Sequence, residues 1–127
     1  MNTGDVINAL LRIPRRFYEL GNVVFMTLLE ESGYCAMPDQ ITESAIRDAL
    51  NKQPEFMRDW QILSEDKRTS GWYWQRNPNG GYEVTYISEV TWTDTEVLSY
   101  SDEASACAAF IKREIEGVRD RAKGSAS

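Results

Sequence analysis

The stretch Gly71-Trp72-Tyr73-Trp74-Gln75, followed by Asn77-Pro78-Asn79-Gly80-Gly81 and then by residues 82–88, decides the fold. The first and last of these segments are rich in aromatic and β-branched residues, which favour strands. Between them, an Asn-Gly pair readily adopts positive φ and is typical of a hairpin turn. We therefore expect a β-hairpin here. Residues 93–100 predict a third strand, antiparallel to the second.

Upstream of the hairpin, apolar residues recur at helical spacing. Four helices are predicted, beginning near residues 3, 22, 42 and 54, and the fourth reaches about Ser64. Gly33 is expected to end the second helix in a left-handed conformation, and Thr42 to be the N-cap of the third. Pro14 marks a break or kink after the first helix, and residues 15–21 lead into the second. That second helix, residues 22–31, has Val24, Phe25, Leu28 and Leu29 as its apolar stripe.

Downstream of the hairpin, Ser101 is a candidate cap for a long last helix over residues 102–121. Its apolar positions lie along one stripe, namely Ala104, Ala108, Ile111, Ile115 and Val118, with Cys107 beside them. The predicted architecture is α+β, with N-terminal helices, a three-stranded antiparallel β-meander and a long C-terminal helix packed on the sheet. One domain is expected over residues 1–122, with a flexible tail at 123–127.

The charge is concentrated in the middle of the chain. The formal net charge is −6, and residues 30–66 carry nine acids and three bases, which accounts for all six surplus charges. Nucleic acid is a poor partner for such a segment, because phosphate binding requires clustered Lys and Arg. A basic protein surface fits it, because a local field of one sign speeds and orients encounter. The alternative is that these helices simply present solvated acidic faces.

Catalytic motifs are scarce in this sequence. It contains no His, so the commonest general base and metal ligand is missing. There is no Cys-x-x-Cys motif, phosphate-binding loop or dinucleotide fingerprint. Carboxylate chemistry is left open, although Glu65 and Asp66 are adjacent and their side chains diverge on regular structure. We therefore expect no enzyme activity, no metal, no cofactor and no small-molecule substrate.

The sequence has no stretch of about 18 apolar residues and no basic start followed by an apolar segment. We expect a cytoplasmic protein that does not bind membranes. The two cysteines, Cys35 and Cys107, are too few for a disulfide scaffold. Cys107 is expected to be buried as a small hydrophobic side chain.

Alternation along the first strand separates its aromatic residues. Trp72 and Trp74 share one face, and Tyr73 and Gln75 share the other. One row must pack on a helix, and the other is either exposed as a set of binding anchors or packed as well. Packing is the favoured alternative for Trp72 and Trp74, because large aromatic side chains usually belong to the core.

Four short blocks carry a family resemblance: Tyr18-Glu19-Leu20-Gly21-Asn22; Glu30-Glu31-Ser32-Gly33-Tyr34; Ser64-Glu65-Asp66-Lys67-Arg68-Thr69-Ser70-Gly71-Trp72-Tyr73; and Ala106-Cys107-Ala108-Ala109-Phe110-Ile111-Lys112-Arg113-Glu114-Ile115-Glu116. In this order they resemble immunity proteins of bacterial contact-dependent growth inhibition and other polymorphic toxin systems. The resemblance spans residues 18–118.

The resemblance implies binding without catalysis. An immunity protein binds the C-terminal toxin domain of its cognate effector, often a basic nuclease, and occludes its active site or substrate groove. The contacts predicted for this chain are Glu55, Asp59, Glu65 and Asp66, with Trp74 and Tyr82 as aromatic anchors. Two other functions stay open, a cytosolic adaptor that uses the same acidic face and a carboxylate-dependent enzyme.

Overall fold

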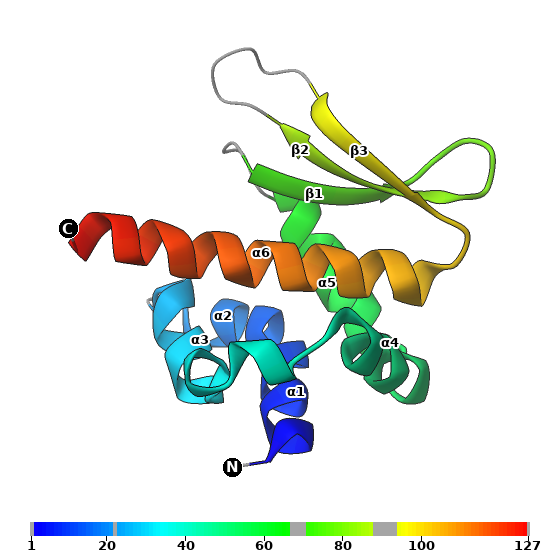
Figure 1. Cartoon of the computed structure of the whole chain (residues 1–127). Coiled ribbons are helices and arrows are strands. Elements are labelled where there is room, and N and C mark those ends of the chain that lie inside the picture. The colour runs from blue at the N-terminus through cyan, green and yellow to red at the C-terminus, as the bar shows by residue number, and fades with distance from the viewer. Residues whose placement is uncertain (1, 22, 67–70, 88–93, 127) are drawn as a thin grey trace.

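The computed structural model describes residues 2–21, 23–66, 71–87 and 94–126. Its long C-terminal helix, α6 (Glu103–Ala126), crosses the molecule between a three-stranded sheet and a group of shorter helices (Figure 1). The sheet covers one side of α6 and helices α1–α4 lie on the other. The α+β prediction, with N-terminal helices, an antiparallel meander and a C-terminal helix on the sheet, is confirmed.

The N-terminal part contains one helix more than the sequence predicted. Helix α1 (Thr3–Leu11) is followed at once by α2 (Ile13–Leu20), in a region predicted to be only a lead-in segment. Pro14 lies in the first turn of α2, where the missing N–H of proline removes no helical hydrogen bond. The chain therefore forms two helices here, and α2 begins where a break or kink was expected.

Two other helix boundaries follow local chemistry. Helix α3 (Phe25–Ser32) ends at Gly33, whose φ of 89° is the left-handed conformation that favours glycine. After two short 3₁₀ turns, η1 (Tyr34–Ala36) and η2 (Pro38–Gln40), the side chain of Thr42 accepts a hydrogen bond from the backbone N–H of Ala45. Thr42 thereby caps α4 (Glu43–Lys52), as predicted. Helix α5 (Glu55–Asp66) then leads to the sheet.

The sheet has the order β1-β2-β3 and both pairings are antiparallel. Strands β1 (Gly71–Arg76) and β2 (Tyr82–Ile87) form the predicted hairpin. Strand β3 (Asp94–Tyr100) pairs with β2 and completes the sheet. In the turn, the side-chain oxygen of Asn77 accepts hydrogen bonds from the N–H groups of Asn79 and Gly81, both 3.0 Å long. Gly80 has a φ of 89°, as the Asn-Gly signal requires. Ser88 and Thr93, at the predicted strand ends, lie outside the described residues.

Helix α6 is buried on several sides along its first half. Residues 106–111 are all buried in succession, whereas a helix on a sheet surface buries one stripe only. The cause is its central position, because the sheet packs on one side and the helices on another (Figure 1). Phe110 meets Trp60 with ring centroids 6.1 Å apart, and Trp60 meets Phe25 at 6.2 Å. Cys107 is buried as expected.

The ends of α6 differ in detail from those predicted. The backbone N–H of Ser105 donates to the Asp102 carboxylate over 2.9 Å, so Asp102 caps the helix and not Ser101. The helix continues to Ala126, beyond the predicted domain end at residue 122. The division into a domain at 1–122 and a tail at 123–127 stays a prediction. None of the described helices has the length and apolar character needed to cross a bilayer.

Candidate functional site

Three of the four predicted acidic contacts lie along one stripe of α5. Residues 55, 59 and 66 fall at helical spacing on the same side, and that side meets α2. Arg15 of α2 forms an ion pair with Asp59 across 2.9 Å between Nη2 and Oδ2. Three residues further along α2, the Tyr18 hydroxyl donates to Asp66 over 2.7 Å. Two predicted contacts are therefore engaged within the molecule.

The seam between α2 and α5 also affects titration and packing. Partial burial, reinforced by the hydrogen bond to the Asp66 carboxylate, raises the pKa of Tyr18 to about 12. The Arg15 guanidinium lies 4.9 Å from the centre of the Phe56 ring. Replacing Asp59 or Asp66 would change the contact between α2 and α5 as well as the surface offered to a partner. Glu55 and Glu65 are exposed, and no described contact joins either of them to α2.

Glu65 and Trp74 line the same shallow hollow between α5 and β1. Its volume is about 360 Å³, and its rim is formed by Gln61, Glu65, Tyr73, Gln75 and Arg76. Trp74 contributes little to the surface, because only 4% of it is exposed. Trp74 is therefore packed in the core, as favoured from the sequence, and its ring is not available as a surface anchor in this conformation.

Tyr82 lies on β2, the strand that pairs with β1. It is half-buried, its ring centroid is 6.5 Å from that of Trp74, and its hydroxyl donates to Glu103 over 3.2 Å. Trp74 pairs with Val84, and Tyr82 is two residues before Val84 on the same strand. The side chains of Trp74 and Tyr82 therefore lie on one face of the sheet, the face that packs on α6. The structure thus brings these two predicted anchors together, but beneath the sheet.

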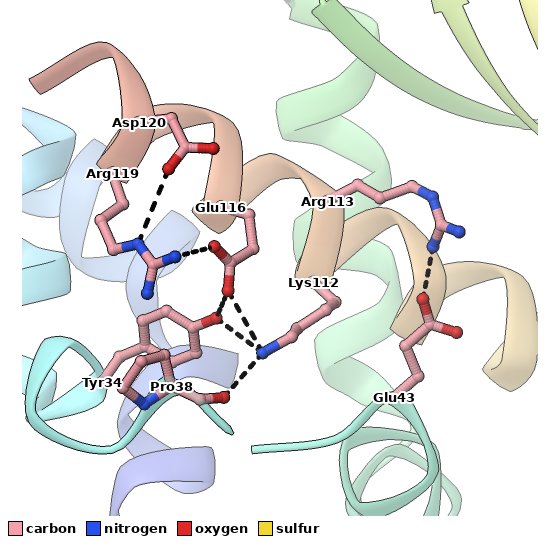
Figure 2. Close-up of polar contacts among 8 residues, drawn as sticks. All are labelled: Tyr34, Pro38, Glu43, Lys112, Arg113, Glu116, Arg119 and Asp120. Carbon is pink, nitrogen blue, oxygen red and sulfur yellow. Dashed lines mark hydrogen bonds and ion pairs between the residues drawn. The ribbon is translucent and has the colours of Figure 1, made fainter. Parts of the chain in front are cut away.

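A partly buried polar cluster, which sequence reasoning missed, joins α6 to the 3₁₀ turns (Figure 2). At its centre the hydroxyl of Tyr34, a fully buried residue, donates to the Glu116 carboxylate. Lys112 donates to the Tyr34 hydroxyl over 2.7 Å and to the backbone carbonyl of Pro38 over 2.9 Å. Arg119 forms an ion pair with Glu116 at 2.5 Å. We call Tyr34, Lys112, Glu116 and Arg119 the Tyr34 cluster.

The Tyr34 cluster holds its groups in fixed protonation states. Burial, together with the bond to Glu116, raises the pKa of Tyr34 well above its usual value, so the phenol stays protonated. Burial alone would raise the pKa of Glu116, but the Tyr34 hydrogen bond and the charges of Arg119 and Lys112 lower it. An ionised carboxylate and a neutral phenol are both far from the titration range of a general acid or base at neutral pH. The cluster is suited to holding the 3₁₀ turns against α6.

The remaining chemistry of the described residues is limited. Burial raises the pKa of Cys107 well above its usual value, which disfavours the reactive thiolate. Within the part of the chain that the structure describes, no group of three His, Cys, Asp or Glu side chains is arranged to hold a metal ion. Next to Lys112 on α6, Arg113 pairs with Glu43 and lies 5.3 Å from the centre of the Trp72 ring.

One part of the Tyr34 cluster has a sequence signal and another has none. Lys112, Glu116 and Arg119 are spaced by four and three residues, so they share one helix face and could have been grouped from the sequence. Tyr34 lies 82 residues from Glu116 along the chain, and no local pattern joins the two.

These features define a small α+β protein whose described acidic side chains lie mostly at the surface or in internal pairs. Comparisons with protein-family profiles, with curated proteins and with solved structures found no match to this chain.

Proposed function

We propose that this chain is an immunity protein that binds a cognate bacterial toxin domain in the cytoplasm and neutralises it. The toxin would be a basic nuclease, and binding would occlude its active site or its substrate groove. The mechanism requires no turnover and no cofactor. The family resemblance of residues 18–118 and the net charge of −6 both favour this function.

The observation that carries the proposal is the exposure of acidic side chains after folding. Glu55, Glu65 and Asp66 all stand at the surface of α5. A nuclease presents Lys and Arg where it holds the nucleic-acid backbone. An inhibitor with exposed carboxylates fits such a surface, and the complementary charges increase the association rate. Occlusion then follows from steric contact over the groove.

The first experiment is co-expression of this chain with the toxin domain encoded directly upstream of it. The proposal predicts that the cells survive and that the two proteins co-purify as a stoichiometric complex. Cell death together with the absence of a complex would contradict the immunity function.

A second experiment tests the α5 surface itself. Glu55→Lys/Glu65→Lys should weaken toxin binding, because it reverses two exposed charges without touching the seam with α2. A matched control is Glu30→Lys/Asp39→Lys, which makes the same change in net charge at exposed residues of α3 and η2. Equal affinities for the two variants would remove α5 from the interface. The double replacement of Asp59 and Asp66 by Lys, also expected to weaken binding, is less selective because both residues contact α2.

The adaptor alternative was predicted to use the same acidic face, but the observation that favours an adaptor is a different, apolar surface. Three of the exposed large apolar side chains lie within seven residues at the corner between α2 and α3, where Tyr18 is 45%, Leu20 52% and Val24 64% exposed. Val24 was predicted inside an apolar stripe, and the structure instead puts it at the exposed N-cap of α3. Apolar contacts are insensitive to salt, so an adaptor that binds through this corner would keep its affinity at high ionic strength. An immunity protein that binds through acidic surfaces would lose affinity at high ionic strength.

A further inference from the structure

One edge of the sheet is closed by a side chain of α5. The Ser64 hydroxyl accepts a hydrogen bond from the backbone N–H of Trp74 over 3.1 Å and donates to the Trp74 carbonyl over 3.3 Å. Ser64 is buried, and α5 packs beside β1. The outer edge of β1 is therefore occupied at Trp74 by a group of this chain.

The same contact fixes the direction of the backbone groups in the other two strands. In an antiparallel strand, successive residues direct their N–H and C=O groups to opposite sides. Because Trp74 directs both groups to Ser64, its partner Val84 directs both to β3, where it pairs with Leu98. The two neighbours of Leu98, Val97 and Ser99, must then direct their backbone groups away from the sheet.

The outer edge of β3 is thus an open row of hydrogen-bonding groups. Among the described residues, no hydrogen bond engages the outward N–H or C=O of Val97 or Ser99, and no helix or strand lies beyond β3 (Figure 1). Val97 is 49% exposed, and Ser99 is also exposed. An open edge of this kind is a template for an added strand, unless charge or proline protects it.

The chain segment that contains β3 carries one sign of charge. Residues 77–111 contain six acids and no Lys or Arg, the acids being Glu83, Glu89, Asp94, Glu96, Asp102 and Glu103. Glu96 is an exposed residue of β3, and Glu83 pairs with Ser99 from the neighbouring strand. Side chains alternate along a strand, so Glu96 on β3 and Glu83 on the middle strand β2, which accepts a hydrogen bond from Asn77, lie on opposite faces of the sheet. A strand that docks here meets carboxylates on both faces.

We propose that the outer edge of β3 is the docking site for an extended, basic segment of a protein partner, which adds to the sheet as a fourth strand. Its backbone would pair with Val97 and Ser99, and its Lys and Arg side chains would lie near Glu83 and Glu96. A second copy of this chain is a poor occupant, because it would bring its own acidic β3 against this one. The partner is taken to be the toxin domain, and in this respect the site rests on the function proposed above.

Hydrogen exchange at single amides, measured by NMR, tests the edge without a mutation. In the protein alone, the amides of Val97 and Ser99 should exchange rapidly and that of Leu98 slowly. A synthetic peptide of alternating lysine and valine should slow exchange at Val97 and Ser99 by about tenfold or more. The matched peptide with glutamate in place of lysine should have no effect. Unchanged exchange with the lysine peptide, or equal protection by both peptides, would overturn the site.

A proline variant gives a second measurement. Val97→Pro removes an N–H that points outward, so pairing with β2 is kept and edge strands tolerate the change. It should weaken binding of the lysine peptide by about tenfold or more, whereas Val97→Thr, which retains the N–H, should bind normally. Equal binding by both variants would contradict strand addition. If Val97→Pro fails to fold, the exchange measurement on the unmodified chain decides.

The immunity function and the edge can fail separately. A co-purified toxin complex in which Val97 and Ser99 remain unprotected would overturn the edge and leave the immunity function standing. Protection by the lysine peptide without any toxin complex would support the edge and contradict the immunity function. Self-association of the chain with protection of the same two amides would show that a second copy occupies the edge and would overturn the assignment to a basic partner.

Discussion

At the residue scale, the Tyr34 hydroxyl is bonded to two charged side chains. It donates to Glu116 and accepts from Lys112, and the residue is fully buried. Tyr34→Phe should lower the free energy of unfolding by about 1–3 kcal/mol, because two charged partners lose a hydrogen bond inside the protein. Urea unfolding measures this change.

Tyr18→Phe is the matched control for that variant. Tyr18 also donates to a carboxylate, but it is 45% exposed, so water replaces the lost bond and the cost should be below about 1 kcal/mol. Equal costs for the two variants would mean that the Tyr34 cluster is open to water.

The ionised state of Glu116 predicts a dependence of stability on acid. Its pKa in the folded protein is lowered from the usual 4.5, so the unfolded chain takes up the proton first as the pH falls. The stabilising contribution of the Glu116 carboxylate is therefore complete above the usual pKa of 4.5 and is lost as the pH falls through the lower pKa of the folded protein. Unfolding free energies of the wild type and Glu116→Gln, measured between neutral pH and about pH 3, should converge in acid. A constant difference would contradict a lowered pKa.

At the scale of elements, Ser64 joins α5 to the edge of β1. Ser64→Ala should destabilise the protein by about 1–3 kcal/mol, because the N–H and the carbonyl of Trp74 both lose their partner at a buried site. Ser44→Ala is the control, since Ser44 is an exposed residue that bonds only the Arg47 side chain in the described structure, and it should change stability by less than about 0.5 kcal/mol. Chemical denaturation compares the two. A small effect of Ser64→Ala would mean that water readily replaces the hydroxyl.

At the scale of the whole molecule, α6 couples the sheet to the N-terminal helices. Phe110 is fully buried at its centre and contacts Trp60 of α5. Phe110→Ala should cost about 3–5 kcal/mol, while Val118→Ala, at the edge of the core, should cost less. Far-ultraviolet circular dichroism and tryptophan fluorescence should give one coincident transition. Two separate transitions would show that the sheet and the helices unfold independently.

The local sequence determined those features that depend on backbone preference and on the period of apolar residues. The Asn-Gly turn, the left-handed Gly33 and the Thr42 cap each need only their own neighbours, and all three form as predicted. The alternation in β1 likewise placed Trp74 on the packed face of the sheet. Helix α2 was missed because Pro14, which lies in its first turn, was interpreted as a break or kink.

Only the tertiary structure decided the state of the charged and polar groups. No local pattern joins Tyr34 to Glu116, Arg15 to Asp59 or Ser64 to Trp74, since each pair is brought together by packing between different elements. The same packing surrounds the first half of α6, engages two of the predicted acidic contacts and leaves the edge of β3 open. The residue type of a side chain fixes its charge. Its neighbours in space determine whether that charge is paired inside the molecule or exposed to a partner.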